Sequence, residues 1–289
     1  MIDLCRLVIA LFIFSCIGWL IEVSLKYIQY HRFINRGYLI GPYCPIYGCG
    51  VVSLTIIVED LIGSDGSHGD VFLAGMVVCG ALEYFVSWVM EKLYHARWWD
   101  YSKKPMNLNG RIWIGNIILF GIGSVIIIKL VNPILFGWLD TWPECATMLS
   151  AVLIVLLLIA DNIISGKMMS VVKKEIDSSK EDNTEEISVR IREILMDKNV
   201  LIRRINKAYP QLKARPRHLT DQWKSAKQEF KEAAKLLKSE LKLLSNIEKE
   251  KIYNANLMAA AEIEYRVEKA KEELERAKEA LHEIEKRIK

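Results

Sequence analysis

Five apolar segments, each long enough to cross a lipid bilayer, constrain the fold of this chain more than any other feature of its sequence. A helix of about 20 apolar residues spans the hydrocarbon core and satisfies its own backbone polar groups. The segments are 4–27, 38–62, 71–94, 112–136 and 145–165. The sequence therefore predicts an all-α, polytopic membrane protein with five transmembrane helices within residues 1–166.

The charges of the connecting loops predict how these helices are oriented, because loops rich in Lys and Arg stay on the cytoplasmic side. The first and third connections are basic, as is the stretch after the fifth segment, whereas the second and fourth connections carry Asp or Glu and no Lys or Arg. We therefore expect the N-terminus outside and the C-terminal tail in the cytoplasm. We expect no cleaved signal peptide, since the first apolar run is too long and lacks a basic start.

Residues 167–289 differ in composition from the membrane part. They carry 29 Lys and Arg and 23 Asp and Glu, against ten and twelve in residues 1–166. Such an asymmetry is typical of a membrane domain followed by a water-facing domain, and its near balance of charge argues against nucleic acid as a partner. We divide the tail into a polar linker (167–186), an amphipathic helix with a Pro-bounded break (187–216) and a long helix, helical hairpin or coiled coil (217–289).

The end of the tail has the apolar spacing of a coiled coil, with alternating steps of three and four over 223–237 and 267–288. The pattern slips between 247 and 257, which two antiparallel helices or a discontinuous coiled coil would both explain. The last residues are regular enough to resemble an engineered extension as well as a native helix. We expect this tail to contact a second copy of the chain or a partner protein.

Carboxylates inside or beside the apolar segments are the main functional signal. Glu83 lies near the middle of the third segment, where a charge costs about 2.5–3.5 kcal/mol, so it should be protonated, paired or facing a wet cavity. Glu22 and Glu91 lie near the inner ends of their segments, where structural ion pairing is the alternative to a functional role. Pro42 and Pro45 favour either a broken, re-entrant helix start or a Pro-started helix.

Two stretches, 19–41 and 88–115, share a pattern that predicts a tandem hairpin repeat. Each begins with Trp-x-x-Glu, crosses a basic aromatic loop and ends in an Asn, Gly and Arg cluster before the next helix. Chance similarity of two short apolar hairpins is the alternative. Transporters often place substrate sites between such repeats.

The residues expected to bind a ligand between the repeats are polar or aromatic groups near the inner ends of the helices. In the transport interpretation, Glu83 responds to protons or cations, Glu22 and Glu91 form an inner gate, and the groups between 99 and 111 contact ligand at the mouth. The full set is Glu22, Asn35, Arg36, Tyr47, Glu83, Glu91, Trp99, Asp100, Tyr101, Asn107 and Arg111.

Two other functions fit the same residues. A membrane-embedded enzyme could use the carboxylates for acid–base chemistry on a lipid or lipid-linked headgroup, although no nucleophile–base pair stands out. A scaffold or regulatory subunit would work through the coiled-coil tail. We expect no catalytic residue, no metal and no cofactor, because the six Cys lack metal-ligand spacing and fit apolar packing.

Several ordered motifs together resemble one known family. They are Trp19-x-x-Glu22, Phe33-x-Asn35-Arg36-Gly37-Tyr38-Leu39-x-Gly41-Pro42, Pro45-Ile46-Tyr47-Gly48, Glu83-Tyr84, Glu91, Trp99-Asp100-Tyr101-Ser102 and Asn107-x-x-Gly110-Arg111-Ile112. The stretch of about residues 4–170 resembles a bacterial integral-membrane family of type IV ABC-transporter permeases (CmpB-like). The resemblance implies transport in a bacterial plasma membrane, in contact with membrane lipids. The chain has no G-x-x-x-x-G-K-[ST] stretch, so an ATPase would be a separate subunit.

Overall fold

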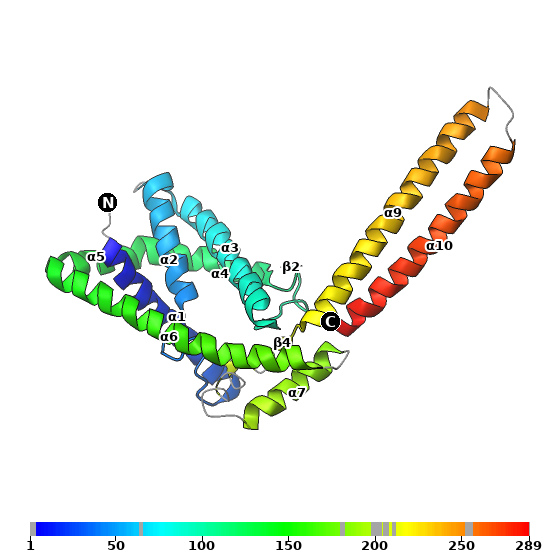
Figure 1. Cartoon of the computed structure of the whole chain (residues 1–289). Helices are drawn as coiled ribbons and strands as arrows, with labels where there is room; N and C mark the ends of the chain where they lie inside the picture. The colour runs from blue at the N-terminus through cyan, green and yellow to red at the C-terminus, as the bar shows by residue number, and fades with distance from the viewer. Residues whose placement is uncertain are drawn as a thin grey trace. The chain divides into compact units, whose positions relative to one another are not determined.

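The chain forms two compact, helical units. The computed structural model describes residues 4–63, 66–179, 183–197, 204, 208–209, 212–251 and 257–288 (Figure 1). The first unit comprises Met1–Glu175 and Arg190–Lys213, and the second comprises Ile176–Val189 and Ala214–Lys289. Helices dominate both units, which confirms the all-α class.

The first helical hairpin consists of α1 (Leu4–Tyr30) and α2 (Pro45–Ile57), which pack against each other. Proline suits the first turn of a helix because its missing N–H would have no partner there. Pro45 occupies this position in α2, and residues 31–44 before it are irregular. Of the two alternatives for this stretch, the structure therefore contains the Pro-started helix. A five-residue π-helix, η1 (Val58–Ile62), continues α2.

The second hairpin consists of α3 (His68–Tyr94) and α4 (Ile114–Ile126), followed by the π-helix η2 (Ile127–Val131) and by α5 (Asn132–Asp140). A capping box starts α3: the Ser67 hydroxyl accepts from the Asp70 N–H and the Asp70 carboxylate accepts from the Ser67 N–H. Helix α3 packs on α4 and on α2, so the two hairpins are joined through α2 and α3.

Short strands shape the loop between α3 and α4. Strand β2 (Asn107–Leu108) pairs antiparallel with β3 (Ile112–Trp113), and β1 (Ala96–Arg97) precedes them. A fourth strand, β4 (Lys213–Ala214), lies in the chain at the boundary between the two units.

The two hairpins have elements of the same length. Helices α1 and α3 each have 27 residues, and α2 and α4 each have 13 residues followed by a five-residue π-helix. Both long helices are followed by a histidine with positive φ, His31 at 51° and His95 at 52°. A left-handed residue is a common helix stop, and π-helices are rare and often lie at functional sites.

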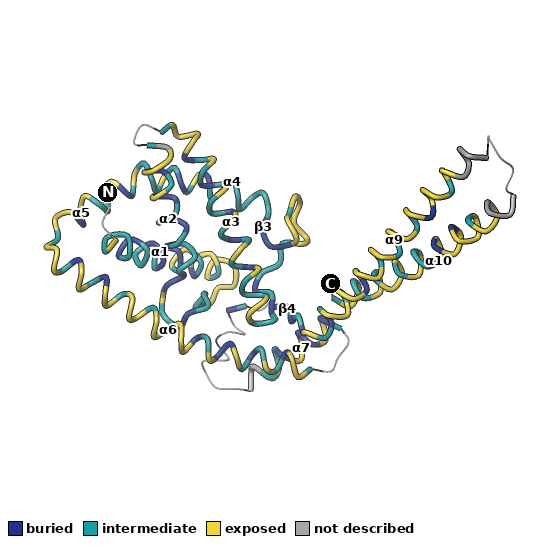
Figure 2. Tube along the Cα trace, turned by 45° about the horizontal axis from the view of Figure 1, so that its top comes forward, coloured by how far each residue is buried: buried dark blue, intermediate teal, exposed yellow. Residues whose placement is uncertain are grey.

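Among the residues that the structure describes, four helices are long and apolar enough to cross a membrane: α1, α3, the continuous stretch Ile114–Asp140 and α6 (Glu144–Ser178). They correspond to four of the five predicted segments. The remaining segment, 38–62, contains α2 and η1 and is helical from Pro45. Arg6 forms an ion pair with Asp140 at 2.6 Å, which places the start of α1 beside the end of α5. The apolar first half of α6 is largely exposed, as expected of a lipid-facing helix (Figure 2).

The stretch predicted as a polar linker is mostly helical. Helix α6 continues to Ser178 and α7 (Thr184–Asp197) follows. The helix continues because Met169, Val172 and Ile176 are fully buried, although polar residues surround them in the sequence. Helix α7 covers the first part of the amphipathic helix predicted over 187–209; most of the remainder lies outside the described residues.

The end of the tail is a pair of antiparallel helices, α9 (Arg217–Lys251) and α10 (Leu257–Ile288), which lie side by side (Figure 1). Ala226, Val267 and Ala270 are buried between them. Glu240, with a nearly buried side chain, pairs with Arg266 at 2.5 Å. Of the two explanations for the slip in apolar spacing, the structure contains the helix pair.

The close approach of α1 and α2 makes Gly48 a sensitive position. A Cβ at Gly48 would lie 2.1 Å from the backbone oxygen of Leu11, which cannot rotate away. We expect Gly48→Ala to destabilise the protein by about 1–3 kcal/mol, the usual cost of overpacking, and to lower its melting temperature in detergent. Gly123→Ala is the matched control, since a Cβ there meets nothing within 4 Å. Equal melting temperatures for the two variants would contradict this packing.

Candidate functional site

Glu83 lies at the centre of a buried polar cluster in the second hairpin, toward the loop between α3 and α4. Its side chain is buried, and its Oε1 accepts hydrogen bonds from the Tyr101 hydroxyl (3.2 Å) and from the Asn116 Nδ2 (3.1 Å). Asn116 also donates to the Tyr101 hydroxyl at 2.9 Å. The other carboxylate oxygen, Oε2, has no hydrogen-bond partner within the described part of the chain. Neutral groups thus form hydrogen bonds with one oxygen of Glu83, whereas the other oxygen has no hydrogen-bond partner among the described residues.

Glu22 supplies a second carboxylate from the first hairpin. It accepts a hydrogen bond from the Tyr47 hydroxyl at 2.7 Å and forms an ion pair with Arg36 at 3.4 Å. Burial and then the charge of Glu83 raise the pKa of the Tyr101 hydroxyl, and the charge of Glu22 adds to this effect. The charges of carboxylates from both hairpins therefore act on the Tyr101 hydroxyl.

Glu91 is held by arginines at the inner end of α3. It pairs with Arg97 at 2.8 Å and with Arg111 at 3.2 Å. Arg111 is itself buried and also donates to the Ser87 hydroxyl at 3.4 Å. Glu22 and Glu91 thus both have the structural ion pairs that were the alternative to a gating role.

Three of the predicted ligand-binding residues form hydrogen bonds that fix the loops. Asn107 donates to the Lys104 carbonyl (2.7 Å) and accepts from the Gly110 N–H (2.9 Å). In the same loop, the indole N–H of Trp99 donates to the Arg111 carbonyl at 2.9 Å. Asn35 accepts from the Trp19 indole at 2.7 Å and donates to the Ile40 carbonyl at 3.2 Å. These bonds shape the loops around the Glu83 cluster.

Asp100, the residue before Tyr101, contacts a residue of the tail. Its carboxylate accepts from Lys213 Nζ at 2.6 Å and from the Ser102 N–H at 3.0 Å. Burial alone would raise the pKa of Asp100, but the hydrogen bonds from Lys213 and Ser102 outweigh it and lower the pKa to about 2. Asp100 therefore stays ionised at any pH that a cell experiences, and its pairing with Lys213 loses strength only as the pH falls below the usual aspartate range.

Asp161 is a functional candidate that the sequence reasoning missed. This α6 carboxylate accepts from the backbone N–H groups of Ile40 (2.9 Å) and Gly41 (2.8 Å) and from the hydroxyls of Tyr43 (2.6 Å) and Ser165 (2.8 Å). A lone Asp inside the apolar run 145–165 was the available signal. Three of these donors, Ile40, Gly41 and Tyr43, lie in the α1–α2 loop (residues 31–44) and fasten it to α6, on which Ser165 also lies. This loop and the α3–α4 loop (95–113) are the two loops predicted on the inner side, and are named the first and second inner loops.

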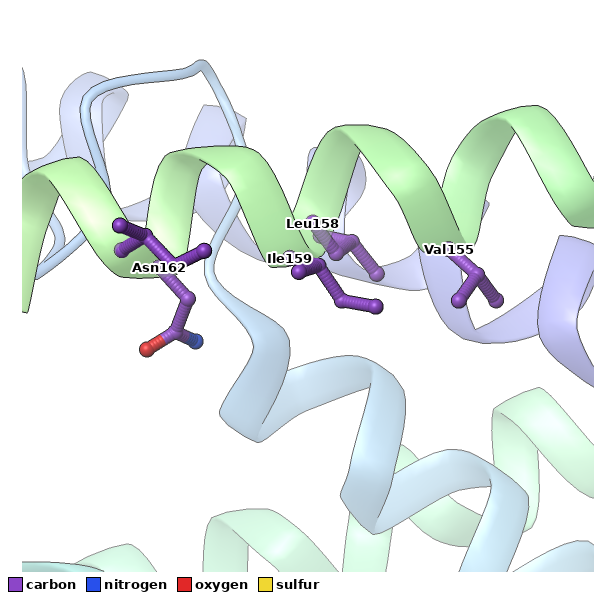
Figure 3. A pocket seen from close by; sticks show the side chains of 5 residues that line it. Val155, Leu158, Ile159 and Asn162 are labelled. Atoms are coloured by element: carbon purple, nitrogen blue, oxygen red, sulfur yellow. The ribbon is translucent and has the colours of Figure 1, made fainter.

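A hollow of about 390 Å³ along α6 is a weaker candidate. Figure 3 shows Val155, Ile159 and Asn162 projecting from one side of the helix. The lining of the hollow is apolar except for Asn162, and it includes no titratable group. Such a surface suits lipid acyl chains, whereas the Glu83 cluster offers ionisable and hydrogen-bonding groups.

Comparison with known families finds a match over the membrane part of the chain. A family model described as "Putative ABC-transporter type IV" matches residues 9–166, more than half of the 289 residues. The matched stretch includes the Glu83 cluster, Glu22, both inner loops and Asp161. No curated protein and no solved structure matches the chain.

Asp161 gives a direct test of how the first inner loop is held. We expect Asp161→Ala to lower the melting temperature in detergent by several degrees, because each buried donor left without its acceptor costs about 1–3 kcal/mol. The neighbouring change Asn162→Ala is the control, since Asn162 lines the open hollow. If the two variants melt at the same temperature, Asp161 does not hold the loop.

Proposed function

We propose that this chain, which belongs to the family described as "Putative ABC-transporter type IV", is a membrane-spanning transport component whose site lies between the α1–α2 and α3–α4 hairpins. The family and the four long apolar helices make it a multi-pass membrane protein of transporter type. The observation that carries the site concerns Glu83, which is a buried carboxylate. Among the described residues, one of its oxygens is bonded by neutral donors and the other has no hydrogen-bond partner.

The physical argument rests on the cost of charge in an apolar interior. An ionised carboxylate there needs a counter-charge, a proton or a bound cation. Arginines serve Glu22 and Glu91, but the groups that bond Glu83 are an amide and a hydroxyl. Glu83 is therefore suited to take up and release a proton or a cation as part of a transport cycle. Tyr101 and Asn116 complete its side of the site, and Glu22 and Tyr47 form the other side.

The contacts support a tandem repeat in a different alignment from the one suggested by the Trp-x-x-Glu motifs. Glu22 bonds Tyr47, the third residue of α2, and Glu83 bonds Asn116, the third residue of α4. We infer that Glu22 and Glu83 are counterparts in the two hairpins, whereas the motifs pair Glu22 with Glu91. Sites between such repeats are common in transporters.

We propose that segment 38–62, which contains α2 and η1, is the fifth helix to cross the membrane. Helix α2 and η1 together run from Pro45 to Ile62, and a fifth crossing is what puts the N-terminus outside and the tail in the cytoplasm of a bacterial cell. The Arg6–Asp140 pair agrees with this orientation, since both residues are then on the outer side. A separate ATPase subunit would supply the energy.

The enzyme interpretation receives less support from the same geometry. The carboxylates nearest the inner face, Glu91 and Asp100, are bound by Arg97 and Lys213 at 2.8 and 2.6 Å. Charge-assisted pairs of this kind occupy the carboxylate oxygens, which does not suit a general acid or base.

Substituting Glu83 tests the site in the cell, where any ATPase partner is present. The experiment uses cells of the organism from which the chain comes, with its gene deleted. We expect these cells to accumulate at least one member of a panel of radiolabelled ions and small solutes to a different level from the parent cells. The wild-type gene should restore the level of the parent. Glu83→Gln keeps the shape of the side chain but removes the ionisable group. We expect the variant gene to restore about a tenth or less of the accumulation difference that the wild-type gene restores, and a tenfold loss corresponds to about 1.4 kcal/mol. Membrane abundance is checked by immunoblot.

Glu144→Gln is the matched control, because Glu144 is an exposed acid at the start of α6 and should restore accumulation fully. Full restoration by both Glu83→Gln and Glu22→Gln would overturn the proposed site. Altered lipid headgroups with unchanged solute accumulation would favour the enzyme instead.

A further inference from the structure

A short segment of the tail lies on the first inner loop. Residues 190–213 belong to the first unit, and within 204–213 the structure describes 204, 208–209 and 212–213. Arg36 donates to the Ala208 carbonyl, and its guanidinium lies 4.8 Å from the centre of the Tyr209 ring. Arg204 donates to the Leu39 carbonyl. Ala208 is buried by these contacts.

The same segment also contacts the second inner loop. The Tyr209 ring meets the buried Trp98 edge-on, with 4.6 Å between ring centres and an angle of 83°. Four residues later, Lys213 forms its 2.6 Å ion pair with Asp100, whose side chain is 9% exposed. One aromatic side chain and one lysine thus join the tail to the loop that carries Tyr101. The segment bridges the two hairpins that flank the proposed site.

The contacts extend to the site itself. Arg36, which holds Tyr209, is also the ion-pair partner of Glu22. Burial raises the pKa of Tyr209 to about 12; the charge of Arg36 opposes this rise, and the charges of Cys44 and Glu22 add to it. Tyr209 therefore lies close enough to Glu22 to feel its charge.

We propose that the two inner loops form a docking surface for Tyr209 and Lys213 of the chain's own tail, and that docking closes the cytoplasmic entrance to the site. The proposal rests on the proposed function in one respect: the entrance leads to Glu22 and Glu83. The surface fits an aromatic residue followed by a lysine, held by a cation–π contact, an edge-on ring and a charged hydrogen bond. These few contacts leave the segment able to undock.

The position of this segment in the chain makes it suitable for control. Pro210 follows Tyr209 in the sequence, and a residue before proline favours an extended backbone. Ala214, directly after Lys213, begins the part of the second unit that includes α9 and α10. The segment is thus connected directly along the chain to the helix pair.

Cys44 reports on docking without any knowledge of the substrate. It is 7% exposed. Arg204 and Tyr209 lie near enough to Cys44 for their charges to act on it. The thiol therefore lies near the docked segment, and its burial keeps a reagent away from it. The experiment uses the full chain with its other five Cys changed to Ala, in inside-out vesicles, and measures labelling by a membrane-impermeant maleimide.

We expect Tyr209→Ala and Lys213→Glu each to speed labelling of Cys44 by about tenfold, the effect of losing one strong contact. The exchanged pair Asp100→Lys with Lys213→Asp should return the rate toward that of the wild type, which a misfolded protein could not do. Lys224→Glu is the matched control, because Lys224 pairs with Asp221 on the exposed face of α9.

Equal labelling rates for the wild type, Tyr209→Ala and Lys213→Glu would overturn the docking proposal. So would fast labelling that the exchanged pair leaves unchanged. This outcome is independent of transport, because Glu83→Gln is expected to remove accumulation while leaving the labelling rate of Cys44 as it is. A failure of the transport site and a failure of the docking surface are therefore told apart.

Discussion

The structure depends on how two carboxylates are accommodated in apolar helices. A charge in the hydrocarbon region costs several kcal/mol unless other groups compensate for it. Asp161 is compensated by four donors, two of them backbone N–H groups, so it serves as a fixed attachment point for the first inner loop. Within the described part of the chain, Glu83 has two neutral donors on one oxygen and no partner on the other. The same chemical group is thus fully hydrogen-bonded in one place and only half hydrogen-bonded in the other.

Close helix packing is what brings the polar groups together. Gly48 lets α2 approach the backbone of α1, and Gly75 lets α3 approach Ser124 of α4. In each hairpin, the third residue of the second helix forms a hydrogen bond with a carboxylate of the first helix. Tyr47 of α2 bonds Glu22 of α1, and Asn116 of α4 bonds Glu83 of α3. Small residues therefore act on the site indirectly, by fixing the separation of the helices that carry it.

The features that could be predicted from the sequence were those that depend on local pattern. Apolar length marked the membrane helices, and an acid inside an apolar run marked Glu83. The partners of these acids come from distant parts of the chain: Asn116 looks like one polar residue in an apolar helix, and Lys213 like one charge among many. Asn107 was predicted to contact a ligand, but its side chain forms hydrogen bonds with the backbone of its own turn instead. Local pattern carries no information about which of these competing bonds forms.

Arg36 connects the parts of the molecule that the sequence keeps apart. Its guanidinium serves Glu22 by an ion pair and the tail segment by a hydrogen bond to Ala208 and a cation–π contact with Tyr209. A guanidinium presents its donors in one rigid plane, so a shift that improves one of these contacts changes the others. Because Glu22 and Glu83 both act on Tyr101, the change reaches the second hairpin as well. In the docking that we propose, control from the tail needs only a small rearrangement of one side chain, since the carboxylate that Arg36 neutralises belongs to the proposed site.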